Sequence, residues 1–187
     1  VNTAAITDRG TILDTSEELF DRMFAINTKA PFFLIQEAAK IMIREKIEGA
    51  IVNIQSMSAH GGQPFITAYC AAKGALSIVT KNSAFSLMKN KIRVNALNIG
   101  WTDTPAEHDI QIRVHKKNDD WIQKEEKKVP FKRLTKPLDV AKVLAFICSE
   151  ESGLMTGSVI DFDQTVNGWH SYSAYDTKIL DDSLLGE

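Results

Sequence analysis

Two side chains that could exchange protons with a substrate stand four residues apart, Tyr69 and Lys73. The sequence around them predicts a helix, on which residues four apart lie on the same face, about 6 Å from each other. A free tyrosine has a pKa of about 10, so proton transfer near pH 7 requires that this pKa fall by about three, which corresponds to about 4 kcal/mol. A neighbouring ammonium favours the phenolate and lowers the pKa of the phenol. The pair therefore indicates acid–base chemistry at a phenol.

A second hydroxyl group stands thirteen residues before Tyr69, at Ser56. Ser56 ends the apolar run 50–55, which follows a glycine and is rich in β-branched residues, as is typical of a buried strand in a parallel sheet. Open α/β sheets bind their ligands beyond the carboxyl ends of the strands. We therefore expect Ser56 and Tyr69 to converge on one substrate oxygen. Ser58 is the competing serine, and the thirteen-residue interval favours Ser56.

The remaining elements are predicted from capping residues and hydrophobic periodicity. A helix is expected to begin with Thr15 as its cap and Glu18 reaching back, as in a capping box. Residues 19–46 predict two helical pieces that meet near Asn27. Further helices are expected at 67–89, within 107–128 and at 137–149, and further strands at 92–99 and 158–162. Alternating strands and helices predict a doubly wound α/β fold around a parallel sheet.

The order of these features closely resembles the classical branch of the short-chain dehydrogenase/reductase family. A strand, Ser56, a loop with two glycines and a helix with Tyr-x-x-x-Lys follow one another as in that family. The resemblance runs to about Gly168. Residues 1–6 resemble the segment that follows the family's fourth strand, and residues 24–27 resemble the helix segment that carries the family's catalytic asparagine. Residues 92–100 resemble the sixth strand and the turn after it. Residues 133–141 and 156–157 match the late helix and the start of the last strand. The departures are Thr3, Ala5, Ile99 where proline is usual, and residues 162–165.

The resemblance implies a Rossmann-like doubly wound sheet of which the amino-terminal part is not in this sequence. The glycine-rich turn that binds the pyrophosphate of a dinucleotide in this family has no counterpart, and the chain opens on Val1. We therefore expect residues 1–168 to form the C-terminal two-thirds of one domain, from the end of the fourth strand onward. Residues 103–130 would be a substrate lid, and residues 169–187 a polar tail. The residue that selects NAD or NADP would lie outside the sequence.

Roles follow for the residues at matching positions. The resemblance implies that Tyr69 is the general acid and base, that Lys73 lowers the pKa of the phenol and binds the nicotinamide ribose, and that Ser56 stabilises the substrate oxygen. Asn27 would bend its helix and hold a water for a proton relay; a buried structural amide is the alternative. The expected cofactor-binding residues are Asn2, Ala4, Tyr69, Lys73, Ile99, Gly100, Thr102 and Thr104.

Two further residues are candidates for the substrate pocket. His60 follows the serine loop, where it would contact the substrate or sense pH, and a loop histidine without such a role is the alternative. Trp101 would form a wall of the pocket or belong to a core. The other histidines lack the spacing of metal ligands, so we expect no metal site. Cys70 and Cys148 fall in predicted helices, which argues against a disulfide framework.

These features predict an NAD(P)-dependent oxidoreductase that interconverts an alcohol and a carbonyl by hydride transfer. The alternatives are a dehydratase or epimerase on the same scaffold, and a catalytically inactive fragment or binding subunit. Serine hydrolysis is disfavoured because the sequence has no Gly-x-Ser-x-Gly motif and His60 has no evident carboxylate partner.

Composition limits the partners of the chain. Its 187 residues are 44% hydrophobic and carry a net charge of −2, which gives no electrostatic argument for nucleic acid or an anionic membrane. Its apolar runs are too short to span a bilayer. We expect a small-molecule alcohol or ketone as substrate, a cytoplasmic location and, from the resemblance, a homodimer or homotetramer. The sequence does not identify the substrate.

Overall fold

Three parallel strands build the sheet of residues 1–165, the part of the chain that the computed structural model describes. They are β1 (Ala50–Ser56), β2 (Arg93–Ile99) and β3 (Val159–Phe162), hydrogen-bonded in this order. Ser56 pairs in register with Ile99, and Ile99 pairs with Phe162, so the carboxyl ends of the three strands are level. The segment at Asn2 forms a parallel bridge with Asn53 beside β1.

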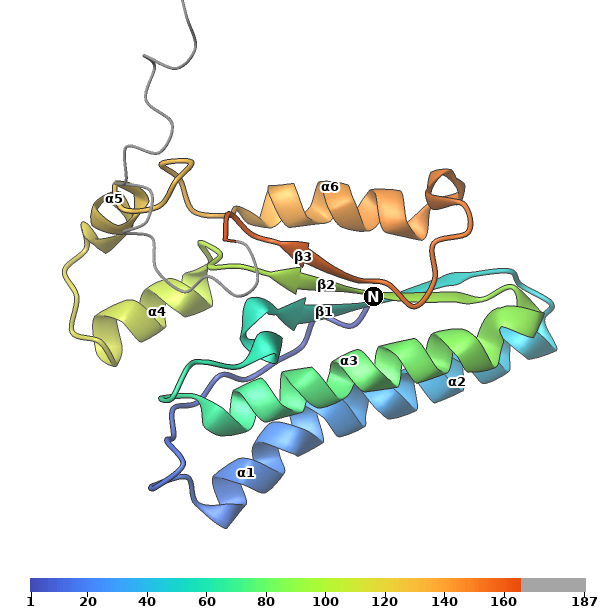
Figure 1. Ribbon diagram of the computed structural model, residues 1–187, viewed down its shortest axis with the longest axis horizontal. Helices are drawn as coiled ribbons and strands as arrows, with labels where there is room; N and C mark the ends of the chain where they lie inside the picture. Colours follow the sequence, from blue (N-terminus) through green and yellow to red (C-terminus); the bar gives the residue numbers. More distant parts are fainter. Residues whose placement is uncertain (166–187) are drawn as a thin grey trace, which may run out of the picture. The chain divides into compact units, whose positions relative to one another are not determined.

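Helices cover both faces of this sheet (Figure 1). One face carries α1 (Glu17–Phe24), a π-helical turn (Ala25–Lys29), α2 (Ala30–Arg44) and α3 (Thr67–Leu87), and the other carries α6 (Pro137–Cys148). Ile51 and Val94 pack against Ile35 of α2 and Ala84 of α3. On the α6 face, Val52 and Leu97 pack against Val140 and Ile147. Helices on both faces of a parallel sheet confirm the predicted doubly wound fold.

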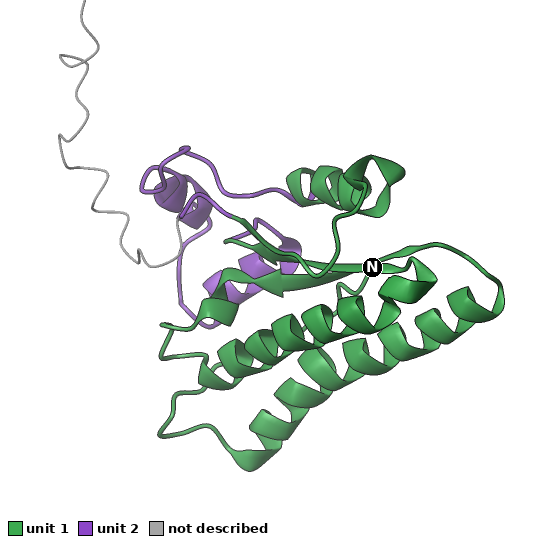
Figure 2. Ribbon diagram, turned by 45° about the vertical axis from the view of Figure 1, so that its right-hand side comes forward, with its two compact units in different colours: residues 1–100, 138–162 green, residues 101–137, 163–187 purple. Residues whose placement is uncertain are grey.

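The described residues separate into two compact units, drawn in different colours in Figure 2. The first comprises residues 1–100 and 138–162, and thus the sheet with the helices named above. The second comprises residues 101–137 and continues from 163, and it contains α4 (Pro105–Arg113) and α5 (Trp121–Glu126). Its own core consists of Trp121, Val129 and Leu134. None of the helices in residues 1–165 has both the length and the apolar character needed to cross a bilayer.

The cap of α1 differs from the prediction. Ser16, and not Thr15, is the N-cap, and its side chain accepts a hydrogen bond from the Leu19 amide at 3.1 Å. The hydroxyl of Thr15 instead donates to the carbonyl oxygen of Thr11 at 2.6 Å, within a turn that Asp14 also stabilises. Because this turn engages the Thr15 hydroxyl, the helix begins one residue later than a capping box on Thr15 would require.

Arg93 joins the start of β2 to the end of α6. Its guanidinium donates to the carbonyl oxygens of Ile147 and Ser149, both at 2.9 Å, and to the hydroxyl of Ser152 at 2.7 Å. The last carbonyls of a helix lack partners within the helix and carry partial negative charge, so a cation is favourable there. Arg93 therefore holds α6 to the sheet.

Replacing Arg93 by Ala is expected to lower the free energy of unfolding by about 3 kcal/mol, because several charge-assisted hydrogen bonds are lost and the half-buried carbonyls stay unpaired. Denaturant unfolding measures this change. The control is Arg44→Ala, which removes an exposed arginine that pairs with its neighbour Glu45 and is expected to change stability by less than about 0.5 kcal/mol. Equal effects of the two substitutions would contradict the role given to Arg93.

Candidate active site

The level carboxyl ends of β1 and β2 place Ser56 at the edge where parallel sheets bind ligands. The Ser56 side chain caps the 3₁₀ turn Met57–His60, since its Oγ accepts from the Ser58 amide at 3.1 Å. Its hydroxyl donates to Ser58 Oγ at 3.0 Å, and Ser58 in turn donates to Gln63 Oε1 at 2.6 Å. Ser58 is buried and Ser56 is only partly buried, which supports Ser56 as the serine that meets a ligand. Rotation of its hydroxyl can redirect the hydrogen without moving the oxygen.

Tyr69 and Lys73 lie on the first two turns of α3, as the sequence predicts. The Tyr69 residue is 8% exposed and packs with Met23, Ile66 and Ala72. The ammonium of Lys73 lies 5.8 Å from the centroid of the Tyr69 ring. It also donates a hydrogen bond to the carbonyl oxygen of Ile54 at 3.0 Å, so it reaches the strand that ends at Ser56. Lys73 thus connects the tyrosine to the strand end that carries the serine.

Burial changes the proton affinity of Lys73. The residue is 2% exposed, and removal from water lowers its pKa from 10.5 to about 8. Ile54 supplies the single hydrogen-bond acceptor for its ammonium among residues 1–165, and none of their carboxylates forms an ion pair with it. An ammonium has three donors. The remaining donors suit a ribose hydroxyl or a phenolate, which fits the role that the resemblance implies.

The serine turn packs against α3. A Cβ atom on Gly74 would lie 3.4 Å from the carbonyl oxygen of Ala59, which is van der Waals contact, so the turn and the helix meet at this position. On another side of α3, the hydroxyl of Thr28 donates to the carbonyl oxygen of Ala72 at 2.8 Å. The segment with Ser56, the helix with Tyr69 and Lys73, and the helical turn with Asn27 therefore pack as one group.

Asn27 lies within the π-helical turn between α1 and α2, where the sequence predicts that two helical pieces meet. Its fully buried side-chain amide makes two hydrogen bonds with the main chain of Ile6, accepting from the amide at 3.1 Å and donating to the carbonyl at 3.0 Å. The side chain therefore has the structural role that was the alternative in the sequence. A water relay at Asn27 stays a prediction.

The residues expected to bind a cofactor occupy different places. Asn2 bridges to β1, with its amide nitrogen donating to Asn53 Oδ1 at 2.8 Å, and Ala4 is exposed in the segment that follows. Ile99 ends β2, and the Gly100 amide donates to the carbonyl of Phe162 at 3.1 Å. Asn2, Ile99 and Ser56 thus all belong to the sheet or its edge. Their cofactor contacts stay predictions.

The other expected residues, Thr102, Thr104 and Trp101, belong to the second unit. Thr102 forms a bridge with Thr135, and Thr104 caps α4 by accepting from the Glu107 amide at 3.1 Å. The indole of Trp101 stacks on Trp121 at 5.7 Å between ring centroids and donates to Glu107 Oε1 at 2.7 Å. Trp101 is therefore part of the core of this unit, and its place in a substrate pocket stays a prediction.

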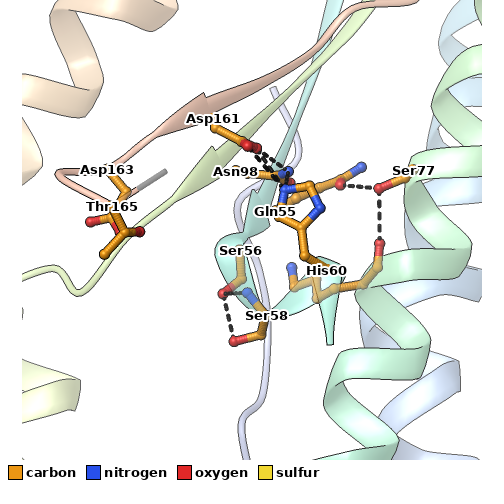
Figure 3. Close-up of polar contacts among 10 residues, drawn as sticks. Gln55, Ser56, Ser58, His60, Ser77, Asn98, Asp161, Asp163 and Thr165 are labelled. Atoms are coloured by element: carbon orange, nitrogen blue, oxygen red, sulfur yellow. Dashed lines mark hydrogen bonds and ion pairs between the residues drawn. The ribbon is translucent and has the colours of Figure 1, made fainter. Parts of the chain in front are cut away.

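His60 has a carboxylate partner, contrary to the prediction. Its Nε2 lies 2.9 Å and 3.1 Å from the two carboxylate oxygens of Asp161 on β3 (Figure 3). Asn98 of β2 donates to Asp161 Oδ1 at 2.8 Å. Neither Asn98 nor Asp161 is predicted as a site residue from the sequence. The one sequence feature that could have indicated Asp161 is its acidic side chain inside the short apolar strand 158–162. The argument against a serine hydrolase therefore depends only on the missing Gly-x-Ser-x-Gly motif.

Metal binding and thiol chemistry are two further kinds of chemistry to consider in the described residues. No group of three or more His, Cys, Asp or Glu side chains in residues 1–165 is arranged to hold a metal ion. Cys70 and Cys148 are both free thiols, and burial raises the pKa of Cys70. The predicted polar tail, 169–187, lies outside the described residues.

Comparison with known proteins shows which family the chain resembles as a whole. A family model described as enoyl-(acyl carrier protein) reductase matches residues 1–167. The chain is 32% identical to carbonyl reductase [NADPH] 2 of Sus scrofa over 163 residues, and 32% identical to galactitol 2-dehydrogenase of Agrobacterium fabrum over 169 residues. Each match covers 87% of this chain and 65% of the relative, so the chain spans about two-thirds of the length of these enzymes.

A solved structure agrees at the level of the fold. The complex of 4-hydroxyisoleucine dehydrogenase with NADH superposes with a TM-score of 0.75 at 29% identity, covering 90% of this chain and 68% of that one. The family model matches nearly the whole chain, and the two relatives and this structure are reductases or dehydrogenases by their names, while the roles of Ser56, Tyr69 and Lys73 stay predictions. The chain belongs to the short-chain dehydrogenase/reductase family.

Proposed function

We propose that the protein is an NAD(P)-dependent oxidoreductase that interconverts an alcohol and a carbonyl, with Tyr69 as general acid and base. The observation that carries this proposal is the buried ammonium of Lys73 beside the Tyr69 ring, hydrogen-bonded to the strand that ends at Ser56. Carbonyl reductase [NADPH] 2 and the NADH complex of 4-hydroxyisoleucine dehydrogenase are similar to this chain, which supports a nicotinamide cofactor.

The protein's part in this reaction is to hold the substrate and to move a proton. In the reductive direction, the Tyr69 hydroxyl donates its proton to the substrate oxygen, and in the oxidative direction the phenolate takes it back. The positive charge of Lys73 favours the phenolate, and its burial strengthens that effect because water screens the charge less. The nicotinamide would supply the hydride chemistry.

Ser56 would hold the substrate oxygen during the proton transfer. Its hydroxyl hydrogen points to Ser58 Oγ in the structure and can rotate to the substrate, while the hydrogen bond from the Ser58 amide keeps the Ser56 oxygen in place. A donor that is already in position stabilises the negative charge that develops on the substrate oxygen. Ser56 is therefore proposed as the oxyanion donor.

The substrate is proposed to be a small alcohol or ketone, and the protein is proposed to act as a homodimer or homotetramer in the cytoplasm. The relatives named above include a carbonyl reductase and a polyol dehydrogenase, which together suggest secondary alcohols and ketones as the first compounds to test. The choice between NAD and NADP is part of the same test.

The proposal is tested with the protein as its gene encodes it. Secondary alcohols and polyols are offered with NAD⁺ or NADP⁺, ketones with NADH or NADPH, and the change in nicotinamide absorbance is followed. We expect turnover with one of the two cofactors. Binding of a cofactor without any absorbance change across the panel would favour a dehydratase or epimerase, and absence of cofactor binding would favour a non-catalytic subunit. Either result would overturn the proposal.

A further inference from the structure

The His60–Asp161 pair connects the serine turn to the far strand of the sheet. His60 is the last residue of the turn that Ser56 caps, and Asp161 lies on β3, 101 residues further along the chain. Both oxygens of the Asp161 carboxylate are within hydrogen-bond distance of His60 Nε2, at 2.9 Å and 3.1 Å. A carboxylate oxygen accepts, so this contact is a hydrogen bond in the tautomer whose Nε2 carries the ring hydrogen.

Asn98 completes this group, which we name the His60 clasp: His60, Asn98 and Asp161. Asn98 and Asp161 are register partners on adjacent parallel strands, and the amide nitrogen of Asn98 donates to Asp161 Oδ1 at 2.8 Å. The Asn98 residue is fully buried, and its Oδ1 has no hydrogen-bond partner within residues 1–165. Turning the amide over would place an oxygen against the carboxylate, so the amide keeps the orientation that serves Asp161.

Hydrogen bonds hold both ends of the turn that begins at Ser56, and the His60 clasp lies at the second end. At the start of the turn, Ser56 Oγ accepts from the Ser58 amide, and at its end the Gly61 amide donates to the Ser58 carbonyl oxygen at 3.0 Å. After the turn the chain passes through Gly61 and Gly62 with positive φ angles of 85° and 86°, which other residues rarely adopt. His60 stands between Ser58 and these glycines, and its side chain links the end of the turn to Asp161 of β3 (Figure 3).

We propose that His60 and Asp161 are positioning residues, which hold the turn so that the Ser56 oxygen lies where the substrate oxygen needs its donor. This inference rests on the proposed function, because it assigns Ser56 that donor role. The substrate-contact role predicted for His60 from the sequence stays a separate prediction, because the contact with Asp161 engages only the ring nitrogen Nε2. The side chains of His60 and Asp161 are 29% and 33% exposed, so their contribution is in geometry more than in charge.

The first measurement is catalytic. H60A and D161A are each expected to lower kcat by about tenfold to a hundredfold, with KM changed by less than about threefold, because a donor that acts on developing charge affects the transition state more than the ground state. In the S56A background, H60A is expected to have no further effect on kcat, since its influence passes through Ser56. An equal loss in both backgrounds would overturn the proposal.

The second measurement does not depend on activity. Hydrogen exchange of the peptide that covers residues 57–61 reports the hydrogen bonds of the Ser58 and Gly61 amides. We expect faster exchange in H60A and D161A. The control is E48A, which removes an exposed ion pair with Lys91, both residues preceding the strands β1 and β2, and is expected to change neither the exchange nor kcat. Unchanged exchange in H60A, or faster exchange with an unchanged kcat, would contradict the clasp.

A third variant, D161N, tests the same proposal if an alanine variant does not fold. D161N keeps one acceptor oxygen and loses the charge, and the same changes are expected at smaller size. The outcome also separates this inference from the proposed function. Loss of activity in S56A with full activity in H60A and D161A would overturn the clasp alone, while full activity in S56A would overturn the donor role of Ser56.

Discussion

Replacing Tyr69 by Phe is expected to lower kcat by about 10²–10⁴-fold in the alcohol–carbonyl assay, because the substitution removes the hydroxyl that carries the proton. The ring of Tyr69 packs with Met23, Ala68 and Ala72 in a buried cluster. Phenylalanine keeps this ring, so the free energy of unfolding is expected to change by less than about 1 kcal/mol. The measurement is kcat with the cofactor saturating, together with denaturant unfolding.

The control for this prediction is the neighbouring residue Cys70, which lies on the same turn of α3 and is only partly buried. Cys70→Ser changes one atom in a side chain with no part in the proposed proton transfer, and kcat is expected to stay within about threefold of the original. If Y69F and C70S had the same activity as the unsubstituted protein, the phenol would not be the general acid, and the function proposed from Tyr69 and Lys73 would be wrong.

The sequence predicts the elements well because local patterns determine them. The strand at 50–55 is observed as Ala50–Ser56, and the helix at 67–89 as Thr67–Leu87 followed by a 3₁₀ turn. The bend near Asn27 is observed as a π-helical turn. In each case hydrophobic periodicity or a side chain with poor helix propensity indicates the element without reference to distant residues.

The errors concern choices between chemically similar neighbours and contacts across the sheet. Thr15 and Ser16 are both good caps, and a turn at Thr11 decides between them. Asp161 and His60 are brought together by the pairing of strands far apart in the sequence. Pairing in a parallel sheet follows from the whole fold, so no local pattern indicates that these two side chains meet.

Sequence spacing likewise predicts that Lys73 lies near Tyr69, but not how deeply it is buried. Its ammonium donates to the Ile54 carbonyl near the end of β1, and burial lowers the pKa of this ammonium to about 8. The spacing of four residues is compatible with a solvated lysine as well. The packing of α3 against β1 decides between the two, and it makes Lys73 a residue that costs stability and serves the proposed chemistry.

Replacing Lys73 by Met is therefore expected to lower kcat and to stabilise the fold. The loss of the cation that favours the phenolate is expected to reduce kcat by about 10²–10³-fold. Met has a similar length and no charge, so the cost of burying the ammonium disappears. A fall in the pKa of Lys73 from 10.5 to about 8 corresponds to about 3 kcal/mol, and loss of the hydrogen bond to Ile54 offsets about 1 kcal/mol of this. At pH 7 the free energy of unfolding is expected to rise by about 2 kcal/mol.

The pH dependence of this gain has a definite sign. Between pH 8 and pH 10.5 the unfolded chain retains the Lys73 proton that the folded chain has lost, so the stability of the unsubstituted protein rises with pH through this window. Below pH 8 both states are charged and the cost of burial is fully present. The stability advantage of K73M is thus expected to be largest at pH 7 and to disappear by about pH 10.5.

The control is Lys81→Met, which replaces an exposed lysine on the same helix. Its free energy of unfolding is expected neither to rise at pH 7 nor to depend on pH in this way. A K73M protein that is less stable than the K81M protein at pH 7 would show that the Lys73 ammonium contributes more to the fold through its hydrogen bond than its burial costs.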